Sequence, residues 1–123
     1  MTRVLVIEDD PFVRKLLELH LRNAGHEVTL AADAIEGLKE VLHAAPDLIL
    51  LDVAMPYMSG LEVLKALKSD ESSRHIPVVM LTGKTDPDTW AEASRSGADA
   101  YLNKPIRIEE LLGTLRELLH PPG

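Results

Sequence analysis

The 123-residue chain has a mass of 13.5 kDa, the size of one ordinary domain with a hydrophobic core of its own. It contains no cysteine, which excludes disulfides, thiolate metal sites and thiol nucleophiles. The formal net charge is -7 and the pI is near 5.1. This acidity argues against direct nucleic-acid binding, which needs a basic face.

The first ten residues, MTRVLVIEDD, hold an apolar run too short for a signal peptide or a membrane span, and acids follow at once. We therefore expect a cytoplasmic protein with no membrane partner. We also expect one domain over residues 1–123. Its closing Pro-Pro-Gly, 121–123, is either a terminal tail or the start of a linker to an output domain.

Short β-branched or leucine-rich runs alternate with segments of helical period. The expected strands are 3–8, 27–31, 47–51, 76–81 and 100–103, and the expected helices are 11–24, 34–44, 60–69, 87–97 and 108–119. Asp10, Asp33 and Ser59 are suitable N-caps, and Asp86-Pro87 is a further start signal, whereas Arg107 is a poor cap. The first helix carries a broad apolar stripe: Phe12, Val13, Leu16, Leu17, Leu19 and Leu21.

Strict alternation of strands and helices predicts an α/β fold of five β-α units, with a parallel sheet covered by helices on both faces. Right-handed crossovers bring the carboxyl ends of all strands to one edge of the sheet. Ligand sites in such doubly wound sheets lie at that edge, near the point where the strand order reverses.

Charged and polar side chains stand at four of the five expected strand ends. Glu8 ends the first strand and Asp9 follows it, Asp52 follows the third, Thr82 the fourth and Lys104 the fifth. Three carboxylates that lie close together repel one another, and burial raises the pKa of a carboxyl group. A hard divalent cation resolves this conflict, and Mg²⁺ suits few carboxylates and several waters, with Mn²⁺ as a substitute.

A metal-bound aspartate beside an ammonium and a hydroxyl group is equipped for phosphoryl transfer. The cation and Lys104 would neutralise the phosphoryl oxygens, the hydroxyl of Thr82 would donate a hydrogen bond, and the carboxylate of Asp52 would attack.

Five separate signals carry a resemblance to a known family: the acids after the first strand, Asp-x-x-Met-Pro-x-x-x-Gly at 52–60, Thr82, Gly-Ala-Asp-Ala-Tyr at 97–101, and Lys104-Pro105. Together they resemble the receiver domain of response regulators in two-component signalling, over essentially the whole chain. The resemblance implies a flavodoxin-like fold with strand order 2-1-3-4-5, which periodicity alone cannot supply.

By this resemblance Asp52 is the phosphoacceptor, Asp9 a direct Mg²⁺ ligand and Glu8 a ligand through water. The backbone carbonyl of Ala54 is the third protein ligand. Many members of the family carry a polar side chain at the position of Ala54. Alanine lacks such a group, so the resemblance does not fix the rate of dephosphorylation. Lys84 is the other residue implied to tune that rate.

Thr82 and Lys104 are implied to bind phosphoryl oxygens. Tyr101 occupies the place of a switch aromatic that turns inward when Thr82 moves, although simple strand packing also explains a tyrosine there. Pro105 is implied to follow a cis peptide bond. Trp90 is either an interface anchor or an ordinary packed helix residue.

The implied function is transfer of a phosphoryl group from a histidine kinase, or a phosphotransfer protein, to Asp52 with Mg²⁺. Such a domain is not an enzyme toward other substrates and catalyses only its own phosphorylation and dephosphorylation. Phosphorylation would change the surface of the fourth helix, fifth strand and fifth helix. Its partner there is a downstream protein, an output domain or a second copy of the chain.

Two other functions compete with this one. Phosphatases of the haloacid-dehalogenase type also use a strand-end aspartate, but they need a second acid two residues later, where this chain has Ala54. A pseudo-receiver that only binds partners usually lacks an acid, the acceptor or the lysine, and none is missing here. No glycine-rich phosphate loop supports nucleotide binding.

Overall fold

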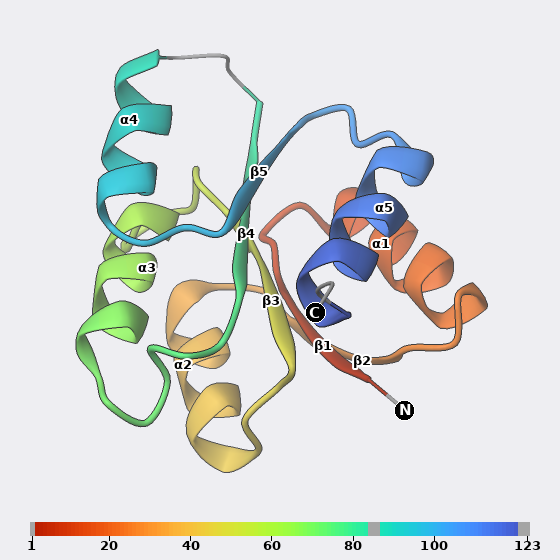
Figure 1. Cartoon of the computed structure of the whole chain (residues 1–123), viewed down its shortest axis with the longest axis horizontal. Helices are drawn as coiled ribbons and strands as arrows, with labels where there is room; N and C mark the ends of the chain where they lie inside the picture. Colours follow the sequence, from red (N-terminus) through yellow and green to blue (C-terminus); the bar gives the residue numbers. More distant parts are fainter. Residues whose placement is uncertain (1, 84–86, 121–123) are drawn as a thin grey trace.

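The structure, a computed structural model, describes residues 2–83 and 87–120 (Figure 1). Its strands are β1 (Arg3–Ile7), β2 (Glu27–Ala31), β3 (Leu48–Asp52), β4 (Val78–Thr82) and β5 (Ala100–Asn103). Its helices are α1 (Pro11–Asn23), α2 (Ala34–His43), α3 (Gly60–Ser69), α4 (Pro87–Arg95) and α5 (Ile108–Leu119). None of the helices in these described ranges is long and apolar enough to cross a membrane.

All five strands are parallel and follow the order β2-β1-β3-β4-β5, which confirms the doubly wound fold. The order reverses between β1 and β3, so the carboxyl ends of these two central strands are neighbours. In the ladder Asp52 pairs with Leu81, and Thr82 pairs with Asn103. The predicted strand-end residues are thus brought to one edge by pairing alone.

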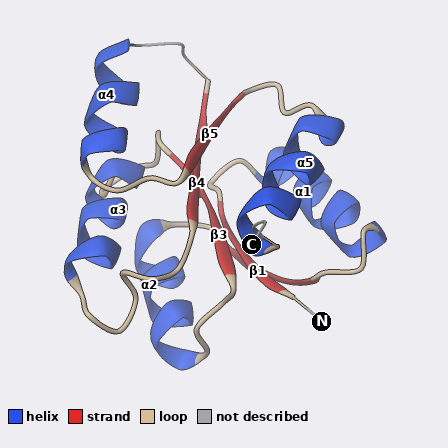
Figure 2. Cartoon of the chain, viewed as in Figure 1, coloured by secondary structure: helices blue, strands red, loops and turns tan. Residues whose placement is uncertain are grey.

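Helices cover both faces of the sheet, as Figure 2 shows, with α1 and α5 on one face and α2, α3 and α4 on the other. Every residue of β3 and β4 is buried, because each strand packs against a helical layer on both sides. This explains the continuous apolar run Leu48–Leu51, which does not alternate. Asp52 completes that run as a buried carboxylate.

Two of the predicted helix starts are confirmed in detail. The Asp10 carboxylate accepts hydrogen bonds from the backbone N–H groups of Phe12 and Val13, and Ser59 forms a reciprocal capping box with Glu62. Asp33 caps α2 through the N–H of Glu36 alone. As expected, the N-cap residue of α5, Arg107, makes no side-chain cap hydrogen bond, and the helix begins at Ile108.

Several predicted boundaries are wrong by one or two residues. The ladder of β1 ends at Ile7, β3 includes Asp52, and β4 starts at Val78 rather than at residue 76. Pro77 has no N–H, and its carbonyl accepts the N–H of Ile49. Helix α4 ends at Arg95 instead of Gly97, and the predicted cap Asp86 lies outside the described residues.

The apolar stripe of α1 is only partly core. Leu17 and Leu21 are buried, but Phe12, Leu16 and Leu19 are exposed by 75%, 38% and 54%. A helix that packs one face on a sheet can bury only the side chains on that face, so the outer part of a broad stripe stays in solvent.

Candidate functional site: an acidic cluster with one lysine

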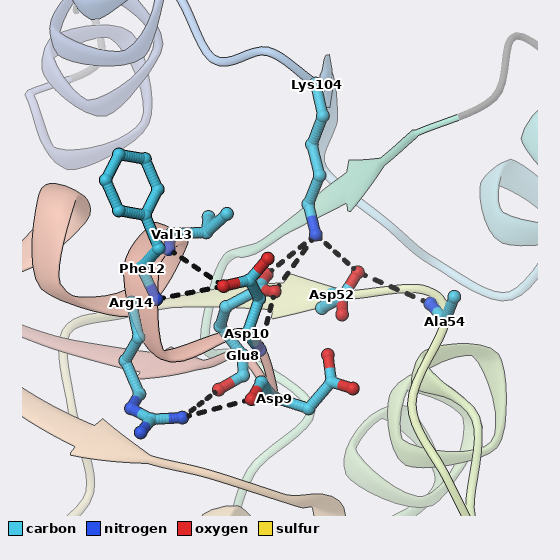
Figure 3. A network of polar contacts seen from close by, with 9 residues as sticks. All are labelled: Glu8, Asp9, Asp10, Phe12, Val13, Arg14, Asp52, Ala54 and Lys104. Carbon is cyan, nitrogen blue, oxygen red and sulfur yellow. Dashed lines mark hydrogen bonds and ion pairs between the residues drawn. The ribbon is translucent and has the colours of Figure 1, made fainter.

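The site lies where β1 and β3 end, side by side, at the carboxyl edge of the sheet (Figure 3). Glu8 is fully buried, Asp52 is 2% exposed and Asp9 is exposed to solvent. One carboxylate oxygen from each of the three lies within 4.8 Å of the others. The structure therefore brings together the three acids that the sequence predicts as metal ligands.

Lys104 reaches the same cluster from the loop after β5. Its Nζ lies 3.1 Å from Oδ1 of Asp52 and 3.0 Å from each carboxylate oxygen of Glu8. The Lys104 N–H donates to the carbonyl of Thr82 at 2.7 Å, which anchors the loop to β4. The bond between Lys104 and Pro105 is cis, as the resemblance implies.

The electrostatics of the cluster are those of an acid-rich site with too little positive charge. Burial, hydrogen bonding with Asp9 and the charge of Glu8 together raise the pKa of Asp52 to about 7, although Lys104 opposes them. Burial lowers the pKa of Lys104, but hydrogen bonds and charge from Glu8 and Asp52 outweigh burial and raise it. Lys104 is therefore a permanent cation at neutral pH.

The backbone that follows Asp52 is held in place by α3. The Ala54 N–H donates to Oδ1 of Asp52 at 3.4 Å, and the Gly60 N–H donates to the carbonyl of Val53 at 2.8 Å. A Cβ atom at Gly60 would lie 2.1 Å from the carbonyl oxygen of Asp52, so only glycine fits there. The close start of α3 thus fixes the end of β3.

Comparison with known proteins identifies the family that this site represents. Residues 4–116 match the response regulator receiver domain family. The chain belongs to the response regulator receiver family. The receiver domain is 40% identical to the DNA-binding dual master transcriptional regulator RpaA of Synechocystis sp., over 97% of this chain and 49% of RpaA. It is 38% identical to the DNA-binding response regulator MtrA of Mycolicibacterium smegmatis, over 95% of this chain and 50% of MtrA.

Solved structures agree with this assignment. The chemotaxis protein CheY4 of Vibrio cholerae matches with a TM-score of 0.92 and 38% identity, over 97% of this chain and 99% of that one. The receiver domain of the sensor histidine kinase PA1611 of Pseudomonas aeruginosa, described with a magnesium ion in its active-site cleft, matches with a TM-score of 0.88 and 28% identity. That match covers 96% of this chain and 97% of the PA1611 domain.

The residues of this receiver domain fit a magnesium ion. Three carboxylates converge, two of them buried, and Lys104 is the cation that contacts both buried acids. Hard oxygen donors with an excess of negative charge are what Mg²⁺ binds, and the exposed Asp9 leaves the cluster open to solvent. The chemistry of the donor set and its geometry agree.

The remaining predicted residues lie around this cluster. Thr82 is 5% exposed at the end of β4, beside Asp52 in the sheet. Tyr101 stacks on Trp90, with ring centroids 5.1 Å apart and an interplanar angle of 6°, and its hydroxyl donates to the carbonyl of Trp90 at 2.9 Å. Lys84 lies outside the described residues.

Arg14 is a residue that the sequence reasoning missed. Its guanidinium donates to the backbone carbonyls of Glu8 and Asp9, at 2.9 and 3.4 Å. Its position was the available signal: a cation near the start of a helix opposes the helix dipole, and the first turn of α1 contains no acid to compensate it.

Proposed function

We propose that this receiver domain accepts a phosphoryl group on Asp52 from the phosphohistidine of a histidine kinase or a phosphotransfer protein. The observation that carries the proposal is the position of the Asp52 carboxylate, between two further acids and the ammonium of Lys104 at 3.1 Å. This combination supplies a nucleophile, a metal-binding donor set and a fixed positive charge at one point.

In the proposed reaction an oxygen of Asp52 attacks phosphorus, the P–N bond of the donor breaks, and its electron pair stays on the imidazole nitrogen. Lys104 pairs with a phosphoryl oxygen, and Thr82 donates a hydrogen bond to another. A Mg²⁺ ion, or Mn²⁺ in its place, held by Glu8, Asp9, Asp52 and the Ala54 carbonyl, supplies further positive charge when bound.

According to this proposal, the domain promotes its own phosphorylation and dephosphorylation and acts on no other substrate. Because the side chain of Ala54 is a methyl group, it cannot hydrogen-bond a hydrolytic water from that position. Lys84 is the other residue proposed to tune the rate.

Partners are proposed for two surfaces. The exposed apolar side chains of α1, Phe12, Leu16 and Leu19, offer a binding strip for the histidine kinase beside the site. The face of α4, β5 and α5, which includes the Trp90–Tyr101 stack, is proposed to change on phosphorylation and to bind an output partner or a second copy of the domain. The receiver domain spans about half of RpaA and MtrA but nearly all of CheY4. These lengths are compatible with an output domain on the same chain and with a separate partner protein.

The test is incubation with acetyl phosphate, with and without Mg²⁺, followed by intact-mass measurement. We expect one phosphoryl adduct that requires Mg²⁺ and is absent in D52N. The matched control is D47N, since Asp47 precedes the same strand at the opposite edge of the sheet, and this variant should retain the adduct.

Two outcomes would contradict the proposal. No adduct under any condition would leave a pseudo-receiver that only binds partners. Sustained turnover of p-nitrophenyl phosphate, dependent on Asp52, would instead indicate a phosphatase.

A further inference from the structure

The segment that carries the two acids leaves the sheet abruptly. The Glu8 N–H still donates to the carbonyl of Ala31 on β2 at 3.0 Å, but β1 ends at Ile7 and α1 begins at Pro11. Three residues therefore connect a strand to a helix and must present the metal-binding carboxylates at the same time.

Glu8 and Asp9 are fixed by different contacts. The Glu8 side chain is fully buried, pairs with Lys104 and accepts the Asp10 N–H at 3.2 Å. The side chain of Asp9 is exposed, so packing does not set its direction. The direction of its carboxylate therefore depends on the backbone of the 8–10 segment, together with the hydrogen bond to Asp52.

Arg14 holds that backbone. A single nitrogen, Nη1, donates to both carbonyls: to that of Glu8 at 2.9 Å and to that of Asp9 at 3.4 Å. In Figure 3 the guanidinium lies on the opposite side of the segment from Lys104, while the Asp9 carboxylate points toward the cluster. The backbone N–H of Arg14 also donates to the carbonyl of Asp10 at 2.9 Å, so one residue ties the segment to α1 twice.

We propose that Arg14 is a positioning residue for the metal site, which orients the Asp9 carboxylate by clamping the backbone carbonyls of Glu8 and Asp9. This inference rests on the proposed function, because it assigns Arg14 a role in binding the ion that phosphorylation needs. Groups that orient ligands from outside a coordination shell typically affect metal affinity about 10- to 100-fold.

The sign of the effect separates positioning from simple electrostatics. A guanidinium near a dication site repels the ion, so neutralising Arg14 without any change of geometry would tighten Mg²⁺ binding. A positioning role predicts the opposite, weaker binding in R14Q. In R14K the charge is retained, but the shorter side chain places its ammonium farther from the two carbonyls that Nη1 of Arg14 reaches, so binding should also weaken.

The experiment measures Mg²⁺ affinity by isothermal titration calorimetry on the wild type, R14Q, R14K and R22Q. Arg22 is the matched control, because its guanidinium also donates to a backbone carbonyl, that of Val28 at 3.1 Å, at the far end of the same helix. We expect an affinity about tenfold weaker in R14Q, several-fold weaker in R14K and unchanged in R22Q. The Mg²⁺ concentration for half-maximal phosphorylation by acetyl phosphate should rise in parallel, with the rate at saturating Mg²⁺ preserved.

Equal or tighter Mg²⁺ binding in R14Q and R14K, in a wild type that is phosphorylated, would overturn the role of Arg14 and leave the proposed function intact. A wild type that neither binds Mg²⁺ nor accepts a phosphoryl group would overturn both. If R14Q does not fold, R14K decides, and equal losses in R14K and R22Q would also refute a local role.

Discussion

Lys104 and Arg14 are both cations beside the acid cluster, but they contact different groups. Lys104 pairs with the carboxylates of Glu8 and Asp52, whereas the guanidinium of Arg14 donates to the backbone carbonyls of Glu8 and Asp9. Lys104 therefore competes with a metal ion for the same negative charge, and Arg14 does not. In the proposed reaction Lys104 acts instead on the phosphoryl oxygens, where a fixed ammonium is pre-organised to stabilise the charge that develops.

Replacing Lys104 by methionine should separate these effects. We expect K104M to bind Mg²⁺ at least as tightly as the wild type, because a competing cation is gone. Phosphorylation by acetyl phosphate should be about 100-fold slower, the cost of losing one pre-organised charge at the reacting centre. Calorimetry and the time course of the intact-mass adduct measure the two quantities.

The matched control for K104M is K15M, because Lys15 is an exposed lysine of α1 whose ion-pair partner within residues 2–83 and 87–120 is Glu18 alone. It should change neither quantity. A K104M variant that is phosphorylated at the wild-type rate would remove Lys104 from the proposed reaction.

Most residues of the acid cluster can be predicted from the sequence. Glu8, Asp9, Asp52 and Lys104 were each predicted, since a parallel sheet brings strand ends together whatever the details of packing. Arg14 was not predicted, because its contacts are with backbone carbonyls. Carbonyl groups are the same at every residue, so the position of Arg14 near the start of α1 marks it as unusual but does not show which carbonyls its guanidinium reaches.

Among the secondary-structure elements, strand boundaries were harder to predict than the starts of helices. Asp52 belongs to β3 because its position is set by the pairing with Leu81, a contact between segments far apart in the chain. The start of α3 at Ser59 was predicted because its capping box is local in sequence. Local hydrogen bonding can be predicted from neighbours, whereas register depends on the partner strand.

The contact of α4 with β5 is the part of the fold that the proposed function ties most directly to signalling. Tyr101 stacks on Trp90 and donates to its carbonyl, so a rotation of Tyr101 must break both contacts. Among the described residues, the buried indole Nε1 of Trp90 has no hydrogen-bond partner. The ring stack and the hydroxyl of Tyr101 are the contacts between these two residues that a movement of α4 would change.

Trp90 is the sole tryptophan of the chain, so its fluorescence reports on this contact. We expect phosphorylation with acetyl phosphate and Mg²⁺ to shift its emission to longer wavelength, as the stack with Tyr101 opens and the indole meets water. Mg²⁺ alone should leave the emission unchanged. Steady-state emission spectra of the wild type, Y101F and Y101L provide the measurement.

Y101F keeps the ring stack and should behave like the wild type before phosphorylation. Y101L lacks the stack and should show a shifted spectrum from the start, with little further change. Identical phosphorylation-dependent shifts in the wild type and Y101L would contradict a switch role for Tyr101.

Across the whole molecule, the sheet buries a carboxylate, that of Asp52, at the end of its central strand. The order β2-β1-β3-β4-β5 buries β3 between neighbours on both edges and helices on both faces, and Asp52 is part of that strand. Periodicity predicted the parallel sheet but not this order, which depends on which strands pair; the family resemblance supplied it. Burial in this position makes the carboxyl group of Asp52 hard to ionise.

That cost makes the stability of the metal-free domain depend on pH. The pKa of Asp52 is raised from 3.8 to about 7 in the folded domain, so between these values the folded state keeps a proton that the unfolded chain has lost. The unfolded state then binds fewer protons, and the free energy of unfolding falls as pH rises through this window. Asparagine at position 52 does not titrate, so D52N should lack this loss.

We therefore expect D52N in EDTA to gain stability over the wild type progressively from pH 4 to 7 and to hold a constant advantage above pH 7. The shift to about 7 sets an upper bound of about 4 kcal/mol on this advantage. Urea denaturation at intervals between pH 4.5 and 8 measures it, with D47N expected to follow the wild-type profile. Mg²⁺ at pH 8 should narrow the gap, because it binds the folded wild type at the carboxylate that D52N lacks. A difference that is flat across the window would show that the folded domain ionises Asp52 as easily as the unfolded chain does.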